Sequence, residues 1–181
     1  MTERLVEGSQ VFLRYPVPED RDEFLGRVRA SRPLHRPWVF APEDDEAFAA
    51  YLRSNRDDTS ERLLVCRGDD GAIVGVYNLS QIFYGGFRSA YLGYYAFRPF
   101  AGRGYMREGL RLVLRYAFGP LGLHRLEANI QPGNTVSIAL VRGAGFRKEG
   151  FSPRYLKIGG RWRDHERWAI LAEDLGGRRR A

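Results

Sequence analysis

The chain has 181 residues, 44% of them hydrophobic and 13% aromatic, which indicates one folded domain with a real core. No apolar run reaches the roughly 18 residues of a transmembrane helix, and the N-terminal stretch lacks the apolar segment of a signal peptide. We therefore expect a cytoplasmic protein without a membrane partner. The net charge of +7 comes almost wholly from arginine. It suits a phosphorylated cofactor, RNA or a ribosomal surface, or it reflects a GC-rich genome, and it does not choose among them.

The first part of the chain predicts a strand and two helices. Residues 11–16 alternate between apolar and polar side chains and predict a strand. Pro18 and the acids after it are typical of a helix start. A proline-rich loop carrying Trp38 and Phe40 follows, and Pro42 with its acids opens a second helix.

The middle of the chain predicts three antiparallel strands and a helix. The strands are expected at 62–68, 72–83 and 89–97, separated by the turns DDG and YGG. Cys66, the lone cysteine, lies in an apolar stretch, which predicts a buried strand residue rather than a disulfide or a metal cluster. After the third strand comes the glycine loop FAGRG, and an apolar face at helical spacing predicts a helix over about 103–118.

The last part predicts a strand at 124–131, a helix capped by Asn134 and a closing hairpin over 146–171. The order β-α-α-β-β-β-α-β-α-β-β predicts an α/β fold of the mixed-sheet (α+β) kind with helices on both faces. We place a single domain over 1–181, with its core at about 11–172 and a solvated tail at 173–181.

The glycine loop fits neither of two well-known phosphate loops. A dinucleotide fingerprint needs glycine where Arg107 stands, and a nucleotide P-loop needs Lys and Ser or Thr after Gly104. The backbone amides from about 102 to 106 nevertheless lie beside a helix N-terminus, which favours an anion. A tight strand-to-helix turn with positive φ angles would use the same glycines. Taken alone, the spacing leaves both interpretations open.

The neighbouring motifs add a family resemblance. The loop resembles the acetyl-CoA pyrophosphate loop of the GCN5-related N-acetyltransferases, Q/R-x-x-G-x-G/A, aligned on 101–106. Ala101 and Met106 depart from that pattern at its two ends. The N-x-x-S of 134–137, the GF-x-x-EG of 145–150 and the hairpin RYLKIGGRWRDH resemble the RimJ/RimL-type ribosomal-protein alanine N-acetyltransferases. The likeness runs from about 11 to 172.

The resemblance implies acetyl-CoA as co-substrate, no metal, and a central sheet whose parallel strands splay apart. The pantetheine arm would pair with the strand at 95–97, and a backbone N–H near Phe97 would polarise the thioester carbonyl. The diphosphate would meet the loop amides, with Arg107 among the flanking cations. The residues expected to bind the cofactor are Tyr95, Ala96, Phe97, Arg98, Ala101, Gly102, Arg103, Gly104, Tyr105, Met106, Asn134 and Ser137.

The same resemblance implies direct attack of an amine on the thioester. Ser137 would face the sulfur as a donor to the leaving thiolate. RimL-type enzymes carry a carboxylate at the position of Arg154, so the general base must lie elsewhere. The candidates for the base are Glu127, Tyr155 and the pair Asp164–His165, acting directly or through water. For His165, a structural role is the more ordinary interpretation. For the acceptor groove we expect Trp38, Phe40 and Asn78.

Three functions remain open at this point. The first is transfer of an acetyl group to a protein N-terminal amine, with a ribosomal protein as acceptor and possible association with the ribosome. The second keeps the fold and acetylates a small amine such as a polyamine, although a basic protein suits a polycation poorly. The third is a non-catalytic module that binds the ribosome or RNA through its arginines. A monomer and a homodimer are both compatible with the sequence.

Overall fold

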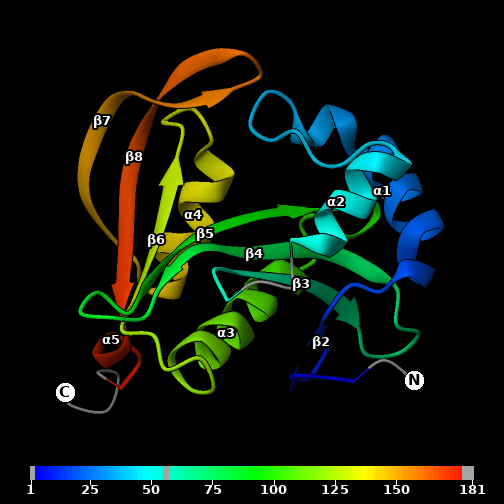
Figure 1. Cartoon of the computed structure of the whole chain (residues 1–181), viewed down its shortest axis with the longest axis horizontal. Coiled ribbons are helices and arrows are strands. Elements are labelled where there is room, and N and C mark those ends of the chain that lie inside the picture. Colours follow the sequence, from blue (N-terminus) through cyan, green and yellow to red (C-terminus); the bar gives the residue numbers. More distant parts are fainter. Residues whose placement is uncertain (1–2, 55–57, 177–181) are drawn as a thin grey trace.

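The computed structural model describes residues 3–54 and 58–176 (Figure 1). Its eight strands form one sheet in the order β1-β2-β3-β4-β5-β6-β8-β7. Only β5 and β6 pair in parallel among these described strands. The strands are β1 (Val6–Glu7), β2 (Val11–Arg14), β3 (Ser60–Arg67), β4 (Ile73–Phe83), β5 (Ser89–Ala96), β6 (Arg125–Ile130), β7 (Arg147–Ile158) and β8 (Arg161–Leu171).

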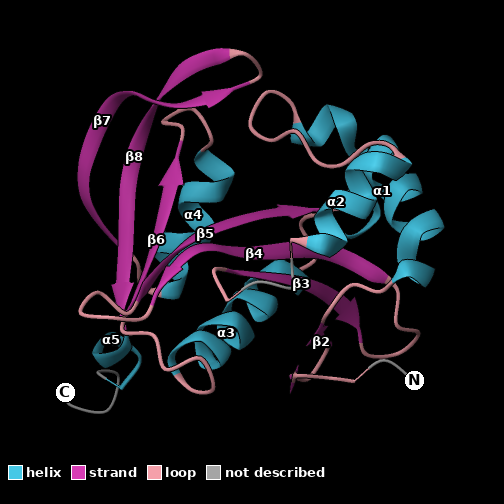
Figure 2. Ribbon diagram, viewed as in Figure 1, coloured by secondary structure: helices cyan, strands magenta, loops and turns pink. Residues whose placement is uncertain are grey.

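Helices cover both faces of the sheet, α1 and α2 on one and α3 and α4 on the other (Figures 1 and 2). Two 3-10 turns, η1 and η2, precede α1 and the glycine loop. This mixed α/β architecture confirms the predicted fold class and element order. The helical elements are η1 (Pro18–Asp20), α1 (Arg21–His35), α2 (Asp45–Arg53), η2 (Arg98–Phe100), α3 (Tyr105–Phe118), α4 (Thr135–Ala144) and α5 (Ala172–Gly176).

Three local predictions need correction. The short β1 was not expected. α1 does not stop before the proline-rich loop but runs through Pro33 to His35, because the His35 ring packs on Tyr95 and Phe97, with centroids 5.1 and 6.1 Å away. The predicted tail begins later than expected, since α5 occupies Ala172–Gly176; the rest of that tail, 177–181, lies outside the described residues.

The core lies on both faces of the sheet. Under α1 and α2, Phe24 packs on Phe48 and Phe97, with ring centroids 5.0 and 5.8 Å apart. Under α3, an apolar face that includes Leu110 is buried against the sheet. Cys66 is fully buried as predicted, and burial raises the pKa of its thiol to about 11. Among the described residues, no helix is long and apolar enough to cross a membrane.

The central strands separate, as the family resemblance implied. β5 and β6 pair only from Ser89↔Arg125 to Tyr91↔Glu127. Beyond that point the two strands diverge, and the sheet opens into a V whose arms are the β2–β5 group and the β6–β8–β7 group (Figure 2). The backbone edge of β5 past Tyr91 is therefore not covered by β6.

Candidate active site

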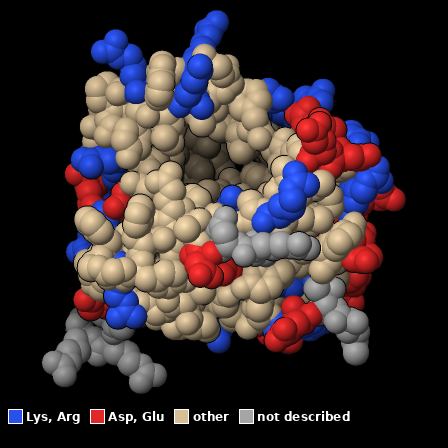
Figure 3. Space-filling view, viewed as in Figure 1, with Lys and Arg blue, Asp and Glu red and all other residues tan. Residues whose placement is uncertain are grey.

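A cavity of about 610 Å³ occupies the opening of the V. It is lined from β5 by residues 92–96, from the end of β6 by residues 129–131, and by parts of α1, α3 and α4. Figure 3 shows the corresponding hollow near the centre of one face. Because the lining includes residues of α1 on one face of the sheet and of α4 on the other, the cavity passes between the splayed strands.

The glycine loop forms one wall of this cavity. Gly102 and Gly104 have φ angles of 76° and 87°, which confirms the turn with positive φ angles, and both glycines face the cavity. A Cβ at either glycine would meet no atom within 4 Å. The space beside the loop is therefore open rather than filled by protein.

The amides of the loop divide into used and available groups. The N–H of Ala101 donates to the Phe97 carbonyl (3.1 Å) and that of Arg103 to the Phe100 carbonyl (3.4 Å). No hydrogen bond among the described residues uses the amides of Gly102 or Gly104. The first-turn amides of α3 also lack helical acceptors, since the first such bond runs from Glu108 to Gly104.

The packing of Met106 accounts for a large residue at a position where the family pattern has glycine or alanine. Its sulfur lies where a Cβ on Gly75 would stand, only 2.3 Å from that ideal position. Its carbonyl accepts a hydrogen bond from the Tyr77 hydroxyl at 2.7 Å. Because Gly75 on β4 has no side chain, there is room for Met106 at this position.

The open edge of β5 presents a different amide from the one expected. The Phe97 N–H donates to the Val74 carbonyl at 2.9 Å, and the Phe97 side chain is fully buried. Because backbone groups alternate sides along a strand, the N–H groups of Tyr94 and Ala96 point toward the V instead. Phe97 itself does not line the cavity, and neither do Arg98, Arg103 or Tyr105.

Asn134 and Ser137 meet at the start of α4. The Asn134 side chain caps the helix by accepting the Ser137 N–H (3.3 Å), as predicted. The Ser137 hydroxyl donates to the Tyr94 hydroxyl at 2.8 Å, and Tyr94 donates to the Ser137 carbonyl at 3.1 Å. Burial raises the pKa of Tyr94 to about 12. Tyr94, which the sequence did not single out, is thus the partner of Ser137 in the cavity wall.

The α1–α2 loop closes the other side of the cavity. Trp38 lines the cavity and packs over Gly133, where a Cβ would lie 3.1 Å from its ring. Phe40 does not line it but packs against Gly159 in the β7–β8 turn. The loop therefore spans both arms of the V, next to the tip of the β7–β8 hairpin in Figure 1.

Two buried histidines line the cavity, and they differ in their hydrogen bonds. His35 Nε2 donates to the Ala96 carbonyl at 2.8 Å, and burial lowers the pKa of this ring. His165 Nδ1 donates to the Arg163 carbonyl at 2.9 Å. His35 is therefore tied to the edge of β5, whereas the Nε2 atom of His165 has no hydrogen-bond partner among the described residues.

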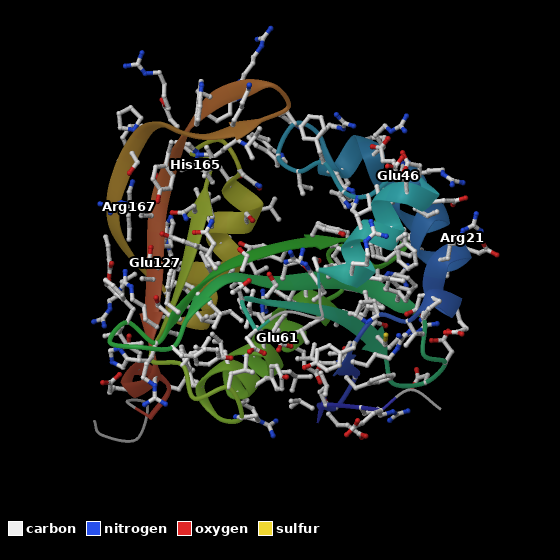
Figure 4. All side chains as sticks on the ribbon, in the orientation of Figure 1. Arg21, Glu46, Glu61, Glu127, His165 and Arg167 are labelled. Atoms are coloured by element: carbon white, nitrogen blue, oxygen red, sulfur yellow. The ribbon has the colours of Figure 1, made fainter. Side chains whose placement is uncertain are left out.

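The other candidate bases lie outside this cavity. Glu127 accepts from Arg125 at 2.8 Å and lines a separate cavity of about 190 Å³. Figure 4 shows Glu127 nearer to the closed end of the V than His165. Tyr155 packs near His165, with ring centroids 6.2 Å apart. Asp164 is exposed and accepts the Arg154 N–H at 2.7 Å.

Asn78, expected in the acceptor groove, is also outside the cavity. Its side-chain oxygen accepts from the Tyr51 hydroxyl at 3.0 Å, so it links β4 to α2. By contrast, two polar atoms of the cavity lining are buried without a partner among the described residues: Tyr95 Oη and Asn129 Oδ1. Such atoms are costly to leave unpaired, and both lie on the α1–α2 side of the sheet.

The cavity has a neutral to basic lining. Its only permanently charged lining residue among those described is Arg107, and no Asp or Glu belongs to it. The wall seen in Figure 3 is likewise mostly uncharged. The same described residues contain no cluster of metal-ligating side chains.

Comparison with known proteins identifies the class. The family described as "Acetyltransferase (GNAT) domain" matches residues 10–147, and the chain belongs to it. RimJ from Mycobacterium smegmatis, solved in complex with CoA-disulfide, has 31% identity and a TM-score of 0.82, over 91% of this chain and 83% of that one.

Two relatives act on different amines. The [ribosomal protein uS5]-alanine N-acetyltransferase of Escherichia coli is 40% identical over 106 residues, 59% of this chain and 55% of that enzyme. The spermidine N(1)-acetyltransferase of Vibrio cholerae is 27% identical over 82% of this chain and 86% of that enzyme. The protein is an acetyltransferase of the GNAT family, whose acceptor these relatives leave open.

Proposed function

We propose that the protein transfers the acetyl group of acetyl-CoA to the α-amine of a protein N-terminus, with a ribosomal protein as acceptor. The observation that carries this proposal is the cavity through the V, which offers amides on the α3–α4 side and no carboxylate among its described lining residues. A polyamine would need acidic side chains to neutralise its charges, whereas a single α-amine does not.

In this proposal, acetyl-CoA binds on the side of the cavity formed by α3 and α4. Its diphosphate meets the amides of Gly102, Gly104 and the first turn of α3, with Arg107 beside them. Its pantetheine arm pairs with the uncovered edge of β5, where the Ala96 N–H replaces Phe97 as donor to the thioester carbonyl. The Ser137 hydroxyl hydrogen, which donates to Tyr94 in this structure, turns to the leaving thiolate and donates to it.

The basicity of the acceptor supports an α-amine as well. A peptide α-amine has a pKa of about 8, whereas lysine and aliphatic amines lie near about 10.4. The α-amine is therefore easier to deprotonate in a cavity whose described lining has no carboxylate. Similarity to the uS5-alanine enzyme points the same way, and similarity to the spermidine enzyme keeps a small amine as the second candidate.

Thermal unfolding with ligands, followed by a turnover assay, tests the proposal. Acetyl-CoA and CoA at about 100 times Kd should add about 2.7 kcal/mol of stability, whereas ATP should add none. Release of CoA thiol should then depend on a peptide that begins with alanine and not on its N-terminally blocked form. Absence of stabilisation by millimolar CoA, or equal thiol release with spermidine and the peptide, would contradict the assignment.

A further inference from the structure

His165 and Asn129 lie on one face of adjacent strands. Asn129 pairs with Arg167 across β6 and β8, and alternation along β8 puts His165 on the same face two residues away. Diagonal neighbours of this kind are about 7–8 Å apart between their backbones. Both residues line the cavity, on the α1–α2 side of the V, and Figure 4 shows His165 toward its open end.

The hydrogen bond of His165 fixes which ring nitrogen can accept a proton. The carbonyl of Arg163 only accepts, so Nδ1, at 2.9 Å, must carry the hydrogen of the neutral ring. Nε2 then has the lone pair. The residue is buried, with 3% of its surface exposed, and it lines the cavity. His35 has the opposite tautomer, because its Nε2 donates to Ala96.

Asn129 supplies a second acceptor. Its Oδ1 is buried and has no hydrogen-bond partner among the described residues. A buried acceptor without a partner lowers stability, and a ligand N–H would satisfy it. The cavity thus holds two acceptors, Nε2 and Oδ1, on the side opposite the glycine loop, and neither is satisfied within the described chain.

We infer that these two atoms receive the acceptor amine, and that His165 is the general base. This rests on the proposed function, because it requires an amine to be acetylated. The acceptor ammonium gives one proton to His165 Nε2, and an N–H of the resulting neutral amine is held by Asn129 Oδ1. The amine nitrogen then attacks the thioester carbonyl, the C–S bond breaks, and the leaving thiolate takes the excess proton of that nitrogen through water. His165 returns its proton to water.

The surroundings of His165 are compatible with this role. Alternation along β8 puts Arg161, Arg163 and Arg167 on the same face as His165, and the ring of Tyr155 on β7 lies 6.2 Å from the His165 ring. On the β6 side, the neighbours Asn129 and Gln131 are neutral. Asp164 points away and is occupied by Arg154. His165 therefore supplies the general base in a chain that carries Arg154 where RimL-type enzymes have a carboxylate.

The kinetic test compares His165→Gln with His124→Gln, a change at an exposed histidine that pairs with Glu173 and lies outside the cavity lining. With alanine-starting peptide and spermidine as acceptors, His165→Gln should lower kcat by about 10²-fold at pH 7. The loss should shrink toward pH 9, where an α-amine with a pKa of about 8 is already neutral. Stabilisation by CoA should persist, and His124→Gln should match the wild type.

Asn129→Ala should raise the acceptor KM about 10-fold and leave the CoA response unchanged. Wild-type kcat in His165→Gln across this pH range would overturn the inference even if acetylation is confirmed. If spermidine reacts and the peptide does not, the acceptor class in the proposed function is wrong, and the comparison of His165→Gln with the wild type is then made with spermidine.

A measurement without turnover covers the case in which neither amine reacts or the variant does not fold. In ¹⁵N-histidine NMR of the wild type, His165 should show the Nδ1–H tautomer and His35 the Nε2–H tautomer. Its Nε2 signal should shift on adding the alanine-starting peptide with CoA. An Nε2–H tautomer at His165, or a signal insensitive to the peptide, would overturn the inference.

Discussion

The two sides of the V present different chemical groups to the cavity: backbone amides on one side and side chains on the other. On the side of α3 and α4, most groups that can hold the cofactor are backbone amides in one stretch of chain, 94–107. On the side of α1 and α2, the polar groups that line the cavity include side chains from three separate elements, His35, Asn129 and His165. A site made of backbone depends on where glycines and helix ends fall, whereas a site made of side chains depends on strand register and on the path of loops.

The largest expected effect tests the backbone side. Gly104→Glu should weaken CoA binding by about 100-fold or more, because the carboxylate repels the diphosphate and the residue must keep a φ of 87°. Gly71→Glu is the matched control, since Gly71 also has a positive φ (73°), open space around it and no contact with the cavity. Titration of CoA by calorimetry measures both, and equal affinities would refute the loop as anchor.

The next effect concerns the hydrogen-bonded hydroxyl groups of Ser137 and Tyr94 in the cavity wall. Ser137→Ala should lower kcat about 10-fold with little change in CoA affinity, because the thiolate loses a hydrogen-bond donor. Tyr94→Phe should have a similar effect, and the double variant should lose little more than either single one. Additive losses, or a loss of CoA affinity in both, would contradict the shared role.

A smaller effect should appear in the loop that closes the acceptor side. Trp38→Ala should raise the acceptor KM about 5-fold and leave CoA binding intact, since Trp38 packs over Gly133 at the cavity wall. Phe83→Ala removes an exposed aromatic residue, 55% accessible, outside this cavity and serves as control. Steady-state kinetics at saturating acetyl-CoA distinguish them; unchanged KM in the Trp38 variant would exclude it from the acceptor site.

The smallest effect is expected at Glu127, the sequence's first carboxylate candidate. Its carboxylate is paired with Arg125 and lines the other cavity. Glu127→Gln should therefore change kcat by less than about 3-fold, as for a partly exposed ion pair. If Glu127→Gln instead lost as much activity as His165→Gln, the base would be Glu127 acting from the closed end of the V.

The fold could be predicted from the sequence because each element carries local signals. Alternating strands, Pro18 and Asn134 marked the element order, and the boundaries shifted by only a few residues. α1 ran past Pro33 because packing of His35 against β5 overrides the local proline signal. β1 and α5 are too short to leave a periodic pattern.

The candidate site was predictable only in part. The glycine loop and the Asn134–Ser137 turn line the cavity where the motifs expected them. Tyr94 and Asn129 were missed, since only strand alternation and the β5–β6 divergence turn them toward the cavity. His35 was missed because the sequence placed it in the proline-rich loop and not in α1. That alternation is the signal that could have found Tyr94, which lies beside the predicted Tyr95 but on the opposite face of the strand.

One product analysis tests the central claim most directly. The wild-type protein is incubated with acetyl-CoA and a peptide that begins with alanine and carries one internal lysine, and the acetylated position is read by tandem mass spectrometry. A cavity that binds acetyl-CoA on one side and a weakly basic amine on the other predicts a single acetyl group on the α-amine. Acetylation of the lysine alone, or an unmodified peptide with a protein that binds CoA, would contradict it.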